Sequence, residues 1–296
     1  MVAIKERLTR GADKMPCTVE LVCIGNELLI GKITNTNAQW LAQRITRLGG
    51  RVTGAIIARD EISEIVKAIR HALSQNPNFI LTTGGLGPTF DDMTLEGIAS
   101  ALEKPLKLNS EALEMIEQRG HRSVLEGRIK EFHLTDVLRK MALIPAGGVP
   151  LRNPVGSAPA ILIEFQETKI IALPGVPTEM KAIFSESVDP MIRELSSNLN
   201  YFEKSLIIKG IGESGLSPFI DQVMTEFPDV YVKSHPRDSE SLGRFIELHI
   251  SALCENPKDP KSIVESACLR MSEIVTGKGA QVREADEDDI RRESAS

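Results

Sequence analysis

The chain has 296 residues, of which 42% are apolar and 26% are charged, so its composition excludes an intrinsically disordered protein. This length predicts about two domains. Lysines and arginines number 35 against 41 aspartates and glutamates, and the net charge of −6 argues against nucleic acid as a partner. No stretch approaches the roughly 18 apolar residues of a membrane span, and the N-terminus lacks the apolar core of a signal peptide. We therefore expect a cytoplasmic protein that does not contact membranes.

The first half of the chain alternates between predicted strands and predicted helices. Strands are predicted at 18–24, 51–58 and 78–83. Asp60 is predicted to cap the helix that leads to the third strand. Alternation at these lengths is typical of parallel βαβ units whose sheet is covered on both faces. We expect an α/β domain over residues 16–195, after a flexible N-terminal extension at 1–15.

The second half of the chain changes its pattern near residue 204. Before that point, helices are predicted near 111–119 and 128–140, and a hairpin joins 160–165 to 169–173. After it, one strand, a helix, two strands and a helix predict a small α+β domain over 204–276. Residues 277–296 are rich in charge and are expected to form a flexible tail. The four cysteines match no redox, zinc or disulfide pattern, so we expect buried, reduced thiols.

The strongest chemical signal is the glycine-rich segment TGGLGPTFDDMT at 83–94, between the third strand and the next helix. Ligands of open α/β sheets bind beyond the carboxyl ends of the strands, and glycines let backbone N–H groups approach a phosphate. The candidate phosphate ligands are Thr83, Gly84, Gly85, Leu86, Gly87, Thr89 and Thr94. The segment lacks the lysine of a P-loop, so Asp91 and Asp92 suggest a divalent cation. An alternative is a plain tight turn whose aspartates cap the helix.

Asp91 and Asp92 are expected to have different roles, because neighbouring residues at a helix start point about 100° apart. One would face the cation and the other would cap the helix.

Three further loops carry small or acidic residues beside predicted strands. They contribute Glu27 in GNELL, then Asn153, Gly156 and Ser157 in NPVGSAP, then Pro174, Gly175 and Glu179 in LPGVPTEM. Each loop alone is typical of ordinary turns. Together with the glycine-rich segment they predict four loops around one site, where Glu27 and Glu179 are candidate carboxylates.

A dinucleotide-binding interpretation of GIGESG at 210–215 is rejected. The next predicted strand lacks the acidic residue that such a unit uses for the ribose, and too few residues remain for a doubly wound sheet.

The four motifs, in this order and at these intervals, resemble the N-terminal part of the CinA family (competence/damage-inducible protein A). That domain is similar to the molybdopterin-binding fold of MoaB, Mog and the gephyrin-like proteins. The resemblance is close over residues 16–185 and looser over 204–224. It implies a three-layer α/β domain with a mostly parallel sheet. It also implies a metal-dependent pyrophosphatase that hydrolyses ADP-ribose, and related nucleoside diphosphate compounds, to AMP and a sugar phosphate.

The resemblance further assigns roles to residues. Asp92 falls on the aspartate of the MoaB-like motif, so we expect it to hold a divalent cation (Mg, Mn or Co), with Glu27 as a second ligand and Asp91 assisting. Lys140 lies where the family has a basic residue and is expected to neutralise a phosphate, while Asn153 and Ser157 would orient the substrate. A homodimer or higher homo-oligomer is implied.

Departures from the family pattern also matter. Asn26 occupies a position where many members carry aspartate. Ala160 replaces the last glycine of the third motif, which puts the approach of the local backbone in doubt. We expect a stand-alone form without the C-terminal deamidase domain of bacterial members.

Two alternatives to the hydrolase stay open. One is a molybdopterin-binding or adenylylating protein of molybdenum cofactor biosynthesis, and the other is a non-catalytic nucleotide-binding module. A fold shared by all three cannot separate them, because function depends on the site.

Overall fold

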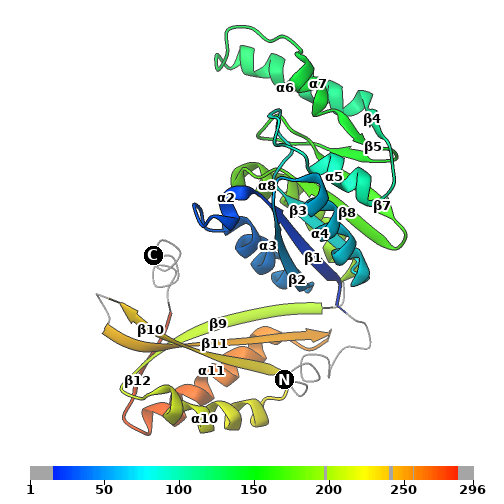
Figure 1. Cartoon of the computed structure of the whole chain (residues 1–296). Coiled ribbons are helices and arrows are strands. Elements are labelled where there is room, and N and C mark those ends of the chain that lie inside the picture. Colours follow the sequence, from blue (N-terminus) through cyan, green and yellow to red (C-terminus); the bar gives the residue numbers. More distant parts are fainter. Residues whose placement is uncertain (1–15, 197–198, 240–242, 256, 286–296) are drawn as a thin grey trace. The chain divides into compact units, whose positions relative to one another are not determined.

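The computed structural model describes residues 16–196, 199–239, 243–255 and 257–285, in two compact units (Figure 1). The large unit comprises residues 17–46 and 50–196. The small unit groups residue 16 and residues 47–49 with the chain beyond residue 196. The expected N-terminal extension at 1–15 and residues 286–296 of the expected tail lie outside the described residues.

The large unit is built on a six-stranded sheet. Its strands lie in the order β2 (Arg51–Ala58), β1 (Thr18–Ile24), β3 (Phe79–Thr83), β8 (Thr168–Leu173), β7 (Ala160–Phe165) and β6 (Val149–Leu151). The first four run parallel, and β7 and β6 add an antiparallel edge. The predicted hairpin supplies β7 and β8, so β8 joins the parallel strands through its pairing with β3.

Helices cover both faces of this sheet, as continuous apolar strands predict. On β1, Val22 and Ile24 join the core with α4 (Ile62–Ser74) and α5 (Thr94–Ala101). Leu21 points to the other face and is equally buried. Figure 1 shows α3 (Thr36–Arg47) on the side of the strands opposite to α4 and α5. There Trp40 packs edge-on against Phe184, with ring centroids 5.4 Å apart.

Phe184 begins a π-helical turn, η1 (Phe184–Val188), which joins α8 (Pro177–Ile183) to α9 (Asp189–Leu195). Pro177 lies in the first turn of α8, as predicted.

An extension of the large unit carries α6 (Ser110–Leu125), α7 (Asp136–Lys140) and the strand pair β4 (Leu106–Leu108) and β5 (Leu143–Pro145) (Figure 1). Helix α6 begins where predicted, because the Asn109 side chain accepts the N–H of Ala112 at 2.9 Å, and it runs further than expected. The helix predicted over 128–140 is wrong for residues 128–135. The helix in this region, α7, starts only at Asp136, after the Thr135 cap.

The predicted cap of α4 is also wrong. Glu61 occupies the cap position and makes no side-chain capping bond. Asp60 instead accepts the N–H of Asn26 at 2.7 Å, and Asn26 begins the short helix α2 (Asn26–Leu29). Asp60 therefore ties two loops of the sheet edge together.

The small unit is an antiparallel sheet in the order β10 (Val230–Ser239), β11 (Gly243–Glu255), β9 (Leu199–Lys209) and β12 (Gln281–Glu284). Helices α10 (Glu213–Glu226) and α11 (Pro260–Thr276) lie on one face of it (Figure 1). The expected bounds of 204–276 are too narrow. β9 begins at Leu199, and β12 lies within the expected tail and pairs with β9. Because Gly210–Gly215 follows a strand of an antiparallel sheet, the structure agrees with rejecting a dinucleotide-binding unit.

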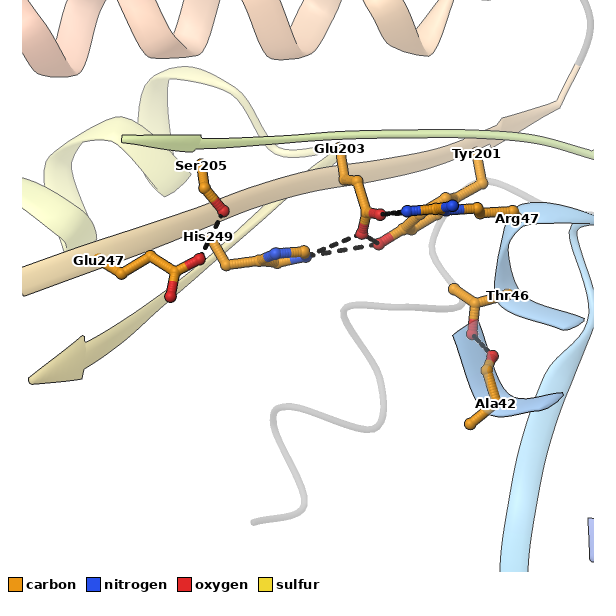
Figure 2. Close-up of polar contacts among 8 residues, drawn as sticks. All are labelled: Ala42, Thr46, Arg47, Tyr201, Glu203, Ser205, Glu247 and His249. Carbon is orange, nitrogen blue, oxygen red and sulfur yellow. Dashed lines mark hydrogen bonds and ion pairs between the residues drawn. The ribbon is translucent and has the colours of Figure 1, made fainter. Parts of the chain in front are cut away.

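The opposite face of this sheet carries a row of polar contacts between β9 and β11 (Figure 2). The hydroxyl of Tyr201 donates to Glu203 Oε2 at 2.7 Å, and His249 Nε2 lies 3.4 Å from the same oxygen. Ser205 donates to Glu247 at 2.9 Å. Burial, reinforced by the bond to Glu203, raises the pKa of Tyr201, so the phenol keeps its proton and stays a donor.

All four cysteines are free and buried, as expected. Burial raises the pKa of Cys17 to about 12 and that of Cys268 to about 11, so both stay as unreactive thiols at neutral pH. None of the helices in the described ranges is long and apolar enough to cross a membrane.

Candidate functional site

The loops that follow β1, β3 and β8 meet at one edge of the sheet. These three strands are parallel neighbours, so their carboxyl ends lie together. The contact is close, because a Cβ added to Gly175 would lie 3.3 Å from the Cα of Gly84. A cavity of about 930 Å³ opens at this edge. Its lining includes most of the expected site residues: Glu27, Thr83, Gly84, Gly85, Leu86, Gly87, Thr89, Asp91, Asp92, Gly156, Ser157, Pro174, Gly175 and Glu179.

Two positions of the glycine-rich turn accept only glycine. Gly84 has a φ of +102°, and a Cβ there would lie 2.1 Å from the carbonyl oxygen of Ile24. Gly85 has a φ of +64°, and its Cβ would lie 2.3 Å from Thr94 Oγ1. A side chain would therefore strain the backbone and collide with its neighbours. The turn is packed closely against the end of β1 and the start of α5.

The N–H groups of residues 84–87 are the candidates for holding a phosphate, and three of these four have no partner among the described residues. Gly84 N–H donates to the carbonyl of Leu173 at 3.1 Å, so this group belongs to the fold and not to a ligand. Within the part of the chain that the structure describes, the N–H groups of Gly85, Leu86 and Gly87 have no hydrogen-bond partner. The start of α5 follows the turn. Three unpaired donors at a cavity wall, next to a helix N-terminus, form an arrangement suited to an anion.

Thr94 and Lys140 do not line the cavity but hold its glycine-rich turn. Thr94 is buried, and its hydroxyl donates to the carbonyl of Gly84 at 2.8 Å. Lys140 Nζ donates to the carbonyl of Thr89 at 2.7 Å. The ammonium group therefore fixes the turn to α7 and places a positive charge beside it.

Asn153 likewise supports the site from behind. Its Oδ1 accepts the N–H of Gly156 at 2.7 Å, and its Nδ2 donates to Glu179 Oε2 at 2.6 Å. A Cβ on Gly156 would lie 2.0 Å from the Glu179 carboxyl carbon, so this loop lies directly on that carboxylate. Asn153 thus positions Gly156 and Glu179, both of which line the cavity.

The two neighbouring aspartates share one partner. Asp92 Oδ2 accepts the N–H of Thr89 at 2.8 Å, and the Thr89 hydroxyl lies within hydrogen-bond distance of both Asp91 and Asp92. The bond from Thr89 lowers the pKa of Asp91. Neither aspartate caps α5, because Met93 holds the cap position without a side-chain bond. The prediction that one of the two aspartates caps the helix is therefore wrong. That the other faces a cation stays a prediction.

Carboxylates crowd the same edge. Burial raises the pKa of Asp60, and the nearby charges of Glu27 and Asp91 raise it further. Such crowding fits a bound cation. No group of three or more His, Cys, Asp or Glu side chains able to hold a metal ion occurs in the described ranges. The residues present thus suit a cation that one or two carboxylates share with phosphate oxygens of a ligand, as is usual for Mg²⁺.

Sequence reasoning missed two parts of the lining. Asn37 donates from Nδ2 to the carbonyl of Gly175 at 2.8 Å, and its buried Oδ1 has no partner among the described residues. The polar run at 34–37, where α3 begins, was the signal available for it. The second part is a wall from α6, the following loop and α7, which includes Arg119 and Arg128. No motif marks these arginines.

Comparisons with known proteins agree with this geometry. The family model of the probable molybdopterin binding domain matches residues 20–194. A protein from Pyrobaculum arsenaticum is 38% identical over 88% of this chain and 96% of its own length. A protein from Thermoplasma volcanium is 38% identical over 85% of this chain and 93% of its own.

A solved structure shows the same fold. The protein CinA with unknown function from Thermoplasma acidophilum is 36% identical, with a TM-score of 0.54, over 60% of this chain and 98% of that one. This match and the family match confirm the expected α/β molybdopterin-binding fold of the large unit. The chain therefore belongs to the probable molybdopterin binding domain family, as a CinA-like protein.

Proposed function

We propose that the cavity binds a phosphorylated organic molecule of the molybdopterin class, with a phosphate on the N–H groups of Gly85, Leu86 and Gly87. The observation that carries this proposal is the run of three donors at the cavity wall that have no partner in the described ranges. The cavity of about 930 Å³ is far larger than a phosphate ion and has room for an organic group on each side of the turn. The family to which residues 20–194 belong supports the pterin as that group.

A second candidate function is hydrolysis of a phosphoanhydride, with ADP-ribose as the substrate. The observation that favours it is the crowding of Asp60, Glu27 and Asp91 around the turn. Asp92 and Glu27 would hold a divalent cation, which neutralises phosphate oxygens and lowers the pKa of a water molecule when bound. Water then adds to one phosphorus and the bridging P–O bond breaks, which gives AMP and ribose 5-phosphate.

The protein's own groups have defined tasks in this reaction. The free N–H groups of the turn hold the phosphoryl oxygens in place. Lys140, fixed on the Thr89 carbonyl, adds positive charge near the charged phosphates. Asp91, which lines the cavity and is not assigned to the cation, accepts the proton of the attacking water, and Ser157 at the cavity wall orients the substrate.

Product analysis by mass spectrometry separates the candidates. The protein is incubated with ADP-ribose and Mg²⁺, Mn²⁺ or Co²⁺. The same protein preparations are titrated with a pterin, and binding is measured by fluorescence. Metal-dependent release of AMP that is lost in Asp92→Asn, and kept in the exposed control Asp221→Asn, supports the hydrolase. Intact ADP-ribose with saturable pterin binding supports the molybdopterin-class ligand alone. Binding of AMP without turnover and without pterin binding indicates a non-catalytic nucleotide module. Light scattering of the purified protein tests the predicted homo-oligomer.

A further inference from the structure

The cavity has a second wall that the glycine-rich turn does not explain. One face of α6 contributes Ile116, Arg119, Gly120 and Ser123, which follow the i, i+3, i+4, i+7 spacing of a single helix face. The loop after α6 adds Arg128, Ile129 and Phe132, and the segment from α7 onward adds Leu138 and Met141. This wall is mostly apolar and contains two guanidinium groups.

The two guanidinium groups share a single carboxylate. Arg119 lies 3.4 Å and Arg128 lies 3.0 Å from Glu126 Oε2, and in the described ranges Glu126 is the ion-pair partner of both. Two positive charges against one negative charge leave an excess of one at the wall. The Arg119 side chain is only 13% exposed, so water screens its charge weakly. Several N–H groups of both side chains remain without a partner in the described part of the chain.

A smaller hollow of about 170 Å³ adjoins this wall. Arg119, Gly156 and Ser157 line both spaces, and the hollow adds Arg122 and Arg152. Arg152 is paired with Glu186 at 3.2 Å. With Glu179, which lies against Gly156, the surface carries four arginines against three glutamates, in a chain whose net charge is −6.

Other parts of the cavity lining have the reverse chemistry. They include Glu27 and Asp60, whose carboxylates accept hydrogen bonds and attract cations. Arg119 and Arg128 only donate and attract anions. One cavity thus offers separate groups to a cation and to an anion.

Packing fixes the position of this second wall, which carries Arg119 and Arg128 and is called the arginine wall below. A Cβ on Gly120 would lie 2.2 Å from the Phe132 ring, so the ring rests directly on α6. The ring also packs edge-on against His121 at 5.2 Å. These contacts hold the loop that carries Arg128 close to the helix that carries Arg119.

We propose that Arg119 and Arg128 bind a second oxyanion, a phosphate or carboxylate, distinct from the phosphate on the glycine-rich turn. Guanidinium groups bind such oxyanions through paired N–H donors. The proposal rests on the proposed function for the position of the first phosphate. The second oxyanion is either part of the same ligand or a separate ion, and the chemistry of recognition is the same.

Calorimetric titration with pairs of ligands tests the proposal. AMP is compared with adenosine 3′,5′-bisphosphate, and ADP-ribose with its 2′-phosphate, because each pair differs by one phosphate. In at least one pair the added phosphate is expected to tighten binding about tenfold, as one charge-assisted contact would. In Arg119→Gln and Arg128→Gln that ratio should fall toward one. Arg139→Gln, which changes an exposed arginine of α7 outside the cavity lining, should keep it.

A separate ion is tested with inorganic phosphate added to protein already saturated with ADP-ribose. Binding that disappears in both arginine variants supports the site and assigns it to a free ion. The proposal is overturned if neither pair shows a gain and inorganic phosphate does not bind, or if the gain survives both substitutions. Arg128 is 63% exposed, so its variant keeps the test valid if Arg119→Gln does not fold.

The two proposals fail in different ways. If the protein binds neither nucleotides nor pterins but binds phosphate in a way that depends on the two arginines, the proposed function is contradicted and the second oxyanion site is supported. If it binds a nucleotide or a pterin and the arginine variants change nothing, the proposed function is supported and the second oxyanion site is contradicted.

Discussion

Replacing Gly84 by alanine should both destabilise the large unit and abolish phosphate binding. The residue has a φ of +102°, which costs an L-amino acid about 1–2 kcal/mol. Its Cβ would lie 2.1 Å from the Ile24 carbonyl oxygen, so the backbone must move. Movement is opposed on both sides, because Gly84 N–H bonds to Leu173 and its carbonyl accepts from Thr94 at 2.8 Å. Loss of one such buried bond costs about 1–3 kcal/mol, for a total of about 2–5 kcal/mol.

Gly147→Ala is the matched control. Gly147 has a φ of +85°, but the atom nearest to an added Cβ is Lys104 Nζ, 3.8 Å away, so only the backbone strain of about 1–2 kcal/mol applies. Urea unfolding is followed by fluorescence of Trp40, the single tryptophan, which packs on Phe184 in the large unit. A difference of about 2 kcal/mol corresponds to about 4–8 °C in melting temperature. Equal losses in the two variants, or a Gly84→Ala protein as stable as the parent, would refute the close packing of the turn.

Three further changes test other parts of the account. Lys140→Met should weaken phosphate binding and cost about 0.5–1 kcal/mol, because the bond to the Thr89 carbonyl is lost; unchanged affinity at low salt would contradict its electrostatic role. Gly156→Ala should lower the melting temperature by displacing the Glu179 carboxylate, and adding Glu179→Ala in the same chain should recover part of the loss. A double variant that melts no higher than Gly156→Ala would contradict this contact. Cys17 should resist alkylation in the folded protein at pH 8, since burial raises its pKa to about 12. Between pH 9 and 12 only the unfolded chain loses this proton, so stability should fall by up to about 1.4 kcal/mol per pH unit, and rapid native labelling would contradict that burial.

The sequence predicts the sheet well because its strands are short, apolar and separated by clear helices. The bounds of β2 at Arg51–Ala58 and the hairpin of β7 and β8 agree with the expectation. It also predicts most of the cavity lining, because loops after neighbouring parallel strands must meet at one edge.

Local and long-range effects account for the errors. The segment 128–135 has helical spacing but is held as a loop, where Phe132 packs onto the bare backbone of Gly120. β12 lies in a charged stretch that becomes a strand only through pairing with β9. A tertiary bond also redirects Asp60 from a cap to Asn26.

The arginine wall shows the limit most clearly. Arg119 and Arg128 lie on a helix and on the loop that follows it, at spacings that carry no signature. Only the fold brings them to the same cavity as Glu27.

The central claim, that the glycine-rich turn holds a phosphate, is tested most directly by a crystal structure of the protein grown with AMP. AMP carries the phosphate without a bond that the protein would hydrolyse. The account predicts phosphate oxygens within about 2.7–3.2 Å of the backbone nitrogens of Gly85, Leu86 and Gly87. AMP bound in the cavity with its phosphate away from these nitrogens would contradict it.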